Sequence, residues 1–200
     1  MSRHHVIYIP GLGDHYAPGQ RQAVRLWRMW GMQGHFEPML WRVGEPLQTK
    51  LNRINAVIDD LLQQGNVVSL VAVSAGASAA LTIFAARKQE LAGLVLISGK
   101  VHNAHRMHPS VIQKNNAFGE ALDGLPAVVE TLTAKDRRRI MSIHPMADES
   151  VPVADTRIPG AVERSIPVMG HFFAIAYGIT IYMPIVVHFL RHQAKEQIKN

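Results

Sequence analysis

Short apolar segments alternate along this sequence with segments of helical periodicity, and this alternation constrains the fold more than any other feature. The apolar segments lie at 6–10, 36–41, 67–73, 93–97, 140–143 and 165–168. They are mainly apolar runs and do not alternate between apolar and polar residues, which is typical of strands that are buried on both faces. The pattern predicts an α/β fold: a three-layer α/β/α sandwich with a mostly parallel six-stranded sheet.

Helical periodicity is found between these segments, at 17–32, 51–62, 75–88 and about 172–193. Residues 101–138 are more polar and look helical in pieces, and Thr133 and Asp136 have the spacing of a capping box. We predict a single domain over residues 1–200. Its only subdivision is a small helical insertion at about 101–138, which is a candidate lid.

Composition excludes several classes of function. The 200 residues include no cysteine, so disulfides, thiol catalysis and cysteine metal sites are ruled out. The net charge is +6, partly from Arg21, Arg25, Arg28 and the run at 137–139. No aromatic or motif pattern accompanies this charge, so we interpret it as a solvated basic face and predict no nucleic-acid partner. The first residues show no signal-peptide pattern, and we predict a cytoplasmic protein.

The segment 172–190 contains no charged residue over 19 positions, close to the length of about 20 that spans a bilayer. Gly178, Pro184 and His188 argue against a membrane-spanning helix. We therefore predict a buried final helix, with a membrane anchor as the less favoured alternative. The oligomeric state is not indicated by any pattern.

One serine stands at the joint between a predicted strand and a predicted helix, in the stretch SLVAVSAGASAALTIFA. Ser74 has small neighbours, Ala72 and Gly76, two residues away on either side. Such neighbours permit a sharp turn that raises the hydroxyl above the sheet, beside the free N–H groups of the next helix. The pattern predicts a nucleophile elbow; the alternative is a small residue at a tight strand–helix crossing.

A serine hydroxyl needs a base, usually histidine, oriented by a carboxylate. Asp148 follows the fifth predicted strand and His171 follows the sixth. Functional groups gather at the carboxyl ends of parallel strands, so both residues should lie at the same edge as Ser74. We predict Ser74, Asp148 and His171 as a catalytic triad, with Asp155 as the second choice of acid and Asp123 as a distant third.

A glycine-bearing turn, IPGLGDH, follows the first predicted strand. Its backbone can direct an N–H group at a developing oxyanion, and we predict Leu12 and Ala75 as the two donors. Gly11, Gly13 and His15 are candidates for lining the substrate pocket.

Three histidines, His102, His105 and His108, are spaced by three residues. A metal site is one interpretation, but no carboxylate lies among them and Pro109 interrupts a helix there. We predict exposed or lid-lining histidines and no metal. No nucleotide-binding fingerprint follows a strand, so we also predict no cofactor.

These motifs resemble the α/β-hydrolase superfamily, in particular the minimal members that lack the first two of its eight strands. The stretch AVSAG has the A-x-S-x-G form found in small bacterial serine esterases and lipases, and DESVPVADTRIPGAVERSIPVMGHF is similar to their later segment. Pro10 departs from the histidine that many members carry at this place. The resemblance covers residues 6–192.

The resemblance implies Ser74 as nucleophile, Asp148 as acid, His171 as base, and the N–H groups of Leu12 and Ala75 as oxyanion donors. The expected activity is cofactor-independent hydrolysis of small-molecule carboxylic esters through an acyl-enzyme. Two alternatives remain open. One is a lipase or thioesterase that prefers long acyl chains, and the other is a non-catalytic binding protein on the same fold.

Overall fold

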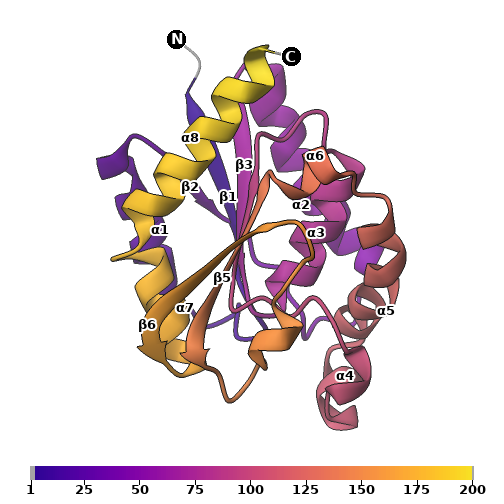
Figure 1. Ribbon diagram of the computed structural model, residues 1–200. Helices are drawn as coiled ribbons and strands as arrows, with labels where there is room; N and C mark the ends of the chain where they lie inside the picture. Colours follow the sequence, from indigo (N-terminus) through magenta and orange to yellow (C-terminus); the bar gives the residue numbers. More distant parts are fainter. Residues whose placement is uncertain (1–2, 200) are drawn as a thin grey trace.

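The computed structural model describes residues 3–199 and contains a six-stranded sheet in which every strand is parallel to its neighbours (Figure 1). The order across the sheet is β2-β1-β3-β4-β5-β6. The strands are β1 (His4–Ile9), β2 (Gln33–Phe36), β3 (Val67–Val73), β4 (Leu94–Ile97), β5 (Ile140–Ala147) and β6 (Val162–Met169). The predicted parallel sheet is confirmed, and all carboxyl ends of the strands lie at one edge.

Helices cover both faces of the sheet, which confirms the predicted three layers (Figure 1). The α-helices are α1 (Pro18–Leu26), α2 (Leu47–Gln63), α3 (Gly76–Ala86), α4 (Pro109–Lys114), α5 (Asn116–Glu130), α6 (Ala134–Arg137), α7 (His171–Ile179) and α8 (Met183–Lys199). Short 3₁₀ helices are η1 (Trp27–Trp30), η2 (Ala104–Arg106) and η3 (Val153–Asp155). Helices α2, α3 and α5 pack on one face, and α1, α7 and α8 pack on the other.

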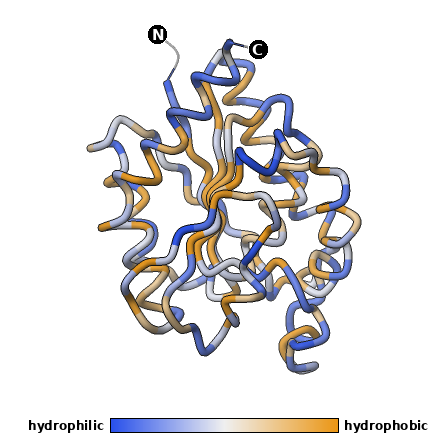
Figure 2. The backbone as a smooth tube through the Cα atoms, in the orientation of Figure 1, coloured by the Kyte–Doolittle hydropathy of each residue, from blue (hydrophilic) through white to orange (hydrophobic). Residues whose placement is uncertain are grey.

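The two hydrophobic cores follow from the period of two in each strand. In β1, Ile7 and Ile9 join the core under α2, α3 and α5, whereas Val6 and Tyr8 join the core under α1, α7 and α8. All four are fully buried. The inner strands therefore form an apolar layer in the middle of the molecule (Figure 2).

The second strand differs from the prediction, because β2 ends at Phe36, where the predicted strand 36–41 begins. β2 is an edge strand and its residues are only partly buried, so it lacks the apolar run that marks the inner strands. A side chain at Gly34 would place its Cβ 2.4 Å from the carbonyl oxygen of Val24. The close approach of α1 to β2 therefore requires glycine at position 34, and this glycine weakens the apolar pattern by which β2 could be predicted.

The C-terminal segment was predicted as one helix over about 172–193, and this prediction is wrong. It forms two helices, α7 and α8, with Thr180 at φ −124° and ψ −82° after α7. Pro184 is the second residue of α8, a position where the missing N–H has no intrahelical partner to lose. The proline thus starts a new helix instead of continuing the first.

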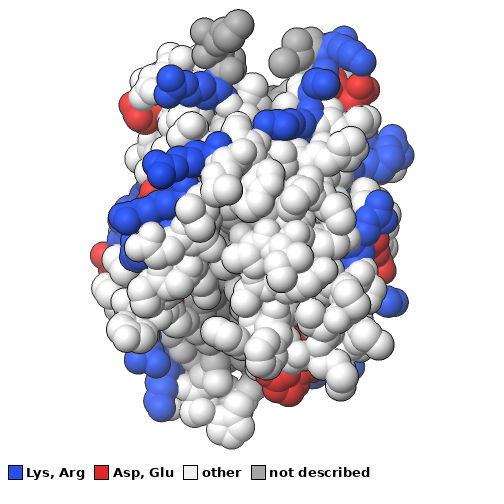
Figure 3. All heavy atoms as spheres, turned by 90° about the vertical axis from the view of Figure 1, so that its left-hand side faces the viewer, with Lys and Arg blue, Asp and Glu red and all other residues white. Residues whose placement is uncertain are grey.

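Among the described residues, no single helix is long and apolar enough to cross a membrane. Helices α7 and α8 reach that length only as a pair, and they are bent by 62° where they meet. Figure 3 shows the side of the molecule on which α1, α7 and α8 lie, with few charged side chains at its centre and Lys and Arg toward its margins.

The predicted insertion at 101–138 contains η2, α4, α5 and α6. The predicted capping box of Thr133 and Asp136 is confirmed at the start of α6. Helix α5 buries Phe118, Leu122 and Leu125 in the core beside α3, so this part of the segment belongs to the layer that covers the sheet. A lid role for the segment stays a prediction.

Candidate active site

Ser74 occupies a tight turn between β3 and α3, at the carboxyl edge of the sheet. Its φ of +51° lies in the left-handed region, which a serine adopts at a cost in free energy. Its N–H donates to the carbonyl of Ile97 at 3.1 Å, and its carbonyl accepts from the N–H groups of Ala77 at 3.1 Å and Lys100 at 3.0 Å. These three hydrogen bonds hold the strained turn in place.

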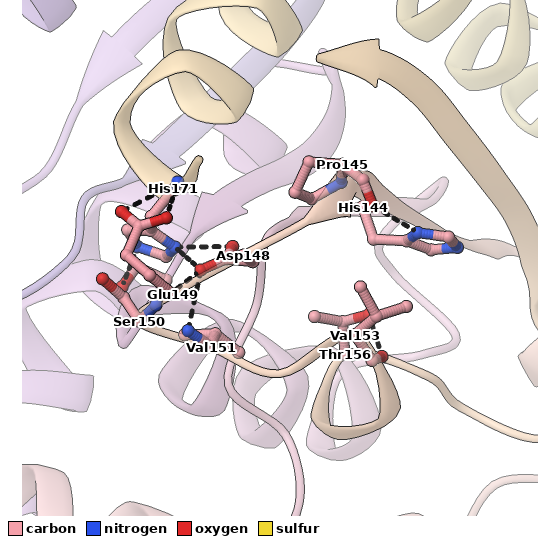
Figure 4. Close-up of polar contacts among 10 residues, drawn as sticks. His144, Pro145, Asp148, Glu149, Ser150, Val151, Val153, Thr156 and His171 are labelled. Atoms are coloured by element: carbon pink, nitrogen blue, oxygen red, sulfur yellow. Dashed lines mark hydrogen bonds and ion pairs between the residues drawn. The ribbon is translucent and has the colours of Figure 1, made fainter. Parts of the chain in front are cut away.

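The side chains of Ser74, His171 and Asp148 meet at this edge, from three separate parts of the chain. His171 Nε2 lies 2.9 Å from Ser74 Oγ. On the other side of the ring, His171 Nδ1 lies 2.8 Å from Asp148 Oδ2 and 3.0 Å from Oδ1, as Figure 4 shows. The three predicted residues therefore lie in one line of carboxylate, imidazole and hydroxyl.

Asp148 is held as an ionised group. Its side chain is fully buried, and its Oδ1 accepts hydrogen bonds from the N–H groups of Ser150 at 2.9 Å and Val151 at 2.8 Å. Burial alone would raise the pKa of Asp148, but the hydrogen bonds from His171 and from these N–H groups outweigh it and lower that pKa. A carboxylate in this state favours the tautomer of His171 with its proton on Nδ1, which leaves Nε2 free to accept a proton.

The loop after β1 lies directly against Ser74. A Cβ built on Gly11 would be 2.9 Å from Ser74 Cβ, and one built on Gly76 would be 2.4 Å from the carbonyl oxygen of Ile9. A side chain at either position would force the neighbouring atoms to move apart. Within the described residues, the N–H group of Leu12 donates to no protein acceptor. The N–H group of Ala75 likewise donates to no acceptor among residues 3–199.

A buried network that the sequence analysis missed supports the same loop. Asp14 is buried, and its Oδ2 accepts from the N–H groups of Leu40 at 2.5 Å and Trp41 at 3.4 Å. Burial raises the pKa of Asp14 in spite of these hydrogen bonds. Lys50 Nζ, also buried, donates to the carbonyl of Leu40 at 2.6 Å, so Asp14 and Lys50 hold the peptide group between Leu40 and Trp41 from opposite sides. Asp14 directly follows the glycine turn, but its spacing alone gave no signal for this role.

Glu149 is a second residue that sequence reasoning missed. It follows Asp148, and its carboxylate accepts the backbone N–H of His171 (Figure 4). The stretch HPMADESVP was singled out for its aspartate, and no periodicity marks the glutamate beside it.

The two reserve acids lie outside this line of three groups. Asp155 is fully buried and forms an ion pair with Lys100 at 2.5 Å and with Arg106 at 3.2 Å. Burial raises its pKa, but the hydrogen bonds from Lys100 and Asn103 and the nearby positive charges lower the pKa of Asp155 overall. Asp123 lies on α5 and is exposed. Of the three predicted acids, Asp148 is the one in contact with His171.

The remaining histidines that the sequence highlighted are dispersed. His102 Nε2 lies 2.6 Å from the carbonyl oxygen of Arg157, and His108 Nδ1 lies 2.8 Å from Ser110 Oγ. His15 is exposed, beside Asp14. Over residues 3–199, no group of three or more potential ligands is placed to hold a metal ion.

The sheet order and the elbow together define the class of fold: the chain has the α/β-hydrolase fold, as the resemblance implied. A carboxylesterase, Cest-2923 from Lactobacillus plantarum WCFS1, superposes with a TM-score of 0.71 at 17% identity, over 97% of this chain and 87% of that chain. Est1E from Butyrivibrio proteoclasticus has a TM-score of 0.65 at 16% identity, over 100% of this chain and 90% of that chain. A monoacylglycerol lipase from Paleococcus ferrophilus has a TM-score of 0.60 at 12% identity, over 94% of both chains. No protein-family model matches the sequence, and no curated protein sequence matches it.

Proposed function

We propose that this protein is a cofactor-independent serine hydrolase that cleaves small-molecule carboxylic esters through an acyl-enzyme on Ser74. The observation that carries the proposal is the continuous line from Asp148 through His171 to Ser74, with contacts of 2.8 and 2.9 Å. The structural similarity to esterases and lipases supports the same class of reaction.

In the proposed mechanism, Ser74 Oγ attacks the ester carbonyl carbon while His171 Nε2 takes the hydroxyl proton. The N–H groups of Leu12 and Ala75 stabilise the oxyanion, and losing one such donor typically costs about 10²–10³ in rate. His171 then gives its proton to the departing alkoxide, which leaves as the alcohol. A water molecule attacks the acyl-enzyme by the same steps, releasing the acid and restoring the Ser74 hydroxyl.

The two alternative functions are a non-catalytic binding protein and an enzyme that prefers long acyl chains. A non-catalytic binding protein would be expected to hold His171 away from Ser74, and the separation of 2.9 Å argues against it. One feature would suit a long acyl chain: a depression of about 550 Å³ at Asp148 and Glu149 is lined also by Met169, Phe172 and Phe173, although Ser74 does not line it. All three of these apolar side chains are more than 60% exposed. A series of p-nitrophenyl esters of increasing acyl length separates the two substrate classes.

The test of the proposal is labelling with a fluorophosphonate probe, which reacts with an activated serine. We expect labelling of the wild type and of Ser165→Ala, which removes an exposed hydroxyl on β6, and none of Ser74→Ala. An unlabelled wild type, or equal labelling of Ser74→Ala, would contradict the proposal.

A further inference from the structure

Glu149 contacts the backbone of His171, the proposed general base. Both oxygens of its carboxylate lie within hydrogen-bond distance of the backbone nitrogen of His171, at 3.1 and 3.2 Å. Figure 4 shows this carboxylate beside the start of α7, where the chain turns from β6 into the helix. The contact is with the backbone of His171, so any effect of Glu149 on the chemistry acts through His171.

The start of α7 needs an acceptor from outside the helix. His171 is the first residue of α7, and the first N–H groups of a helix have no partner within it. The N-cap residue, Gly170, has no side chain to accept such a hydrogen bond. Glu149 supplies the acceptor, and its negative charge is also favourable at the positive end of the helix dipole.

This contact is one of three that tie the segment after β5 to the start of α7. The N–H of Gly170 donates to the carbonyl of Ala147 at 2.8 Å, and the imidazole of His171 contacts Asp148 at 2.8 Å. Residues 147–149 thus contact 170–171 at every position. The Glu149 contact fixes the backbone of His171 relative to the loop that carries Asp148.

From this geometry we propose that Glu149 is a positioning residue for His171. It holds the first turn of α7 so that the imidazole stays between the Asp148 carboxylate and the Ser74 hydroxyl. The inference rests on the proposed function, since it concerns the base of that reaction. A base works only within about 2.6–3.2 Å of the proton it takes, so a small displacement of the helix start lengthens a contact that is now 2.9 Å.

Two substitutions separate positioning from charge. Glu149→Ala removes the acceptor, whereas Glu149→Gln keeps an acceptor oxygen and loses the charge. Both changes are at an exposed residue, so the core is untouched. The matched control is Glu130→Ala, which removes an exposed carboxylate at the end of α5 and changes the net charge by the same amount as Glu149→Ala.

The first measurement is steady-state hydrolysis of a p-nitrophenyl ester that the wild type turns over. We expect kcat of Glu149→Ala to fall roughly tenfold with KM within about twofold, and Glu149→Gln and Glu130→Ala to stay within about threefold of wild type. An unchanged kcat in Glu149→Ala overturns the inference, and so does a Glu149→Gln variant as slow as Glu149→Ala.

The second measurement does not depend on turnover. We expect a proton between His171 Nδ1 and Asp148 Oδ2 to give a downfield resonance in the proton NMR spectrum. We expect this signal to be sharp in the wild type, broadened in Glu149→Ala and restored in Glu149→Gln, while a sharp signal in Glu149→Ala overturns the inference. If the wild type fails to react with the fluorophosphonate, the proposed function falls, but the NMR comparison still decides whether Glu149 positions the histidine.

Discussion

Replacing Gly11 by alanine is a direct test of how closely the glycine turn must approach the nucleophile. The added methyl would lie 2.9 Å from Ser74 Cβ and 3.3 Å from Ser74 Oγ. Gly11 does not have a positive φ, so alanine is conformationally allowed there and the effect comes from contact alone. Ser74 cannot yield freely, because its turn is held by hydrogen bonds to Ile97, Ala77 and Lys100.

The size of the effect follows from these distances. Two carbon atoms in favourable contact are about 3.5–4.0 Å apart, so the glycine turn and Ser74 must separate by roughly 0.6–1 Å. Overpacking of this kind costs about 1–3 kcal/mol of stability. A misplacement of about 1 Å in a catalytic group lowers turnover roughly 10²-fold. We therefore expect Gly11→Ala to fold, with a lower melting temperature and about 10²-fold lower kcat.

The matched control is Gly13→Ala in the same turn, where an added Cβ would meet no heavy atom within 4 Å. The assay is kcat and KM for a p-nitrophenyl ester, together with the rate of fluorophosphonate labelling and a thermal unfolding curve. We expect Gly13→Ala to stay within about threefold of wild type. Gly11→Ala with the activity of Gly13→Ala, or an equal loss in both variants, would refute the steric argument.

Two further predictions concern stability. Burial lowers the pKa of His4 from 6.5 to about 4, so between these pH values the unfolded chain binds more protons than the folded protein. The free energy of unfolding should therefore decrease as the pH falls. From pH 7 to pH 5 we expect wild type to lose roughly 2 kcal/mol more than His4→Gln. Equal slopes of unfolding free energy against pH in the two proteins would contradict this. Asp155→Ala leaves the buried Lys100 without its carboxylate, and we expect a loss of about 3–5 kcal/mol in chemical denaturation. Asp123→Ala, at an exposed site, should cost under about 0.5 kcal/mol, and a similar loss in both aspartate variants would show that the buried ion pair is not the cause.

The inner strands could be predicted from sequence, because a strand that is buried on both faces requires a run of consecutive apolar residues. β3 and its turn at Ser74 illustrate this, since strand, small neighbours and helix follow one another directly. Asp148 and His171 were found by the same logic, because each closely follows a strand of the same parallel sheet. The edge strand β2 carries only a partial signal, and its placement depends on Gly34 and the helix above it.

The supporting residues of the site could not be predicted, because their roles depend on contacts across long sequence separations. Asp14 acts on the peptide groups of Leu40 and Trp41, and Glu149 acts on the backbone of His171. Acidic residues in loops are common, and nothing in the local pattern distinguishes these two from solvated ones. The break between α7 and α8 was missed for a related reason: an apolar run without charges fits one buried helix as well as two.

The left-handed backbone conformation of Ser74 means that folding and the proposed chemistry favour different residues at position 74. A residue with a side chain in this conformation costs about 1–2 kcal/mol, a cost that glycine avoids. A sequence selected for folding alone would therefore carry glycine at position 74. At position 74 the proposed chemistry thus requires a hydroxyl where the backbone conformation alone would favour glycine.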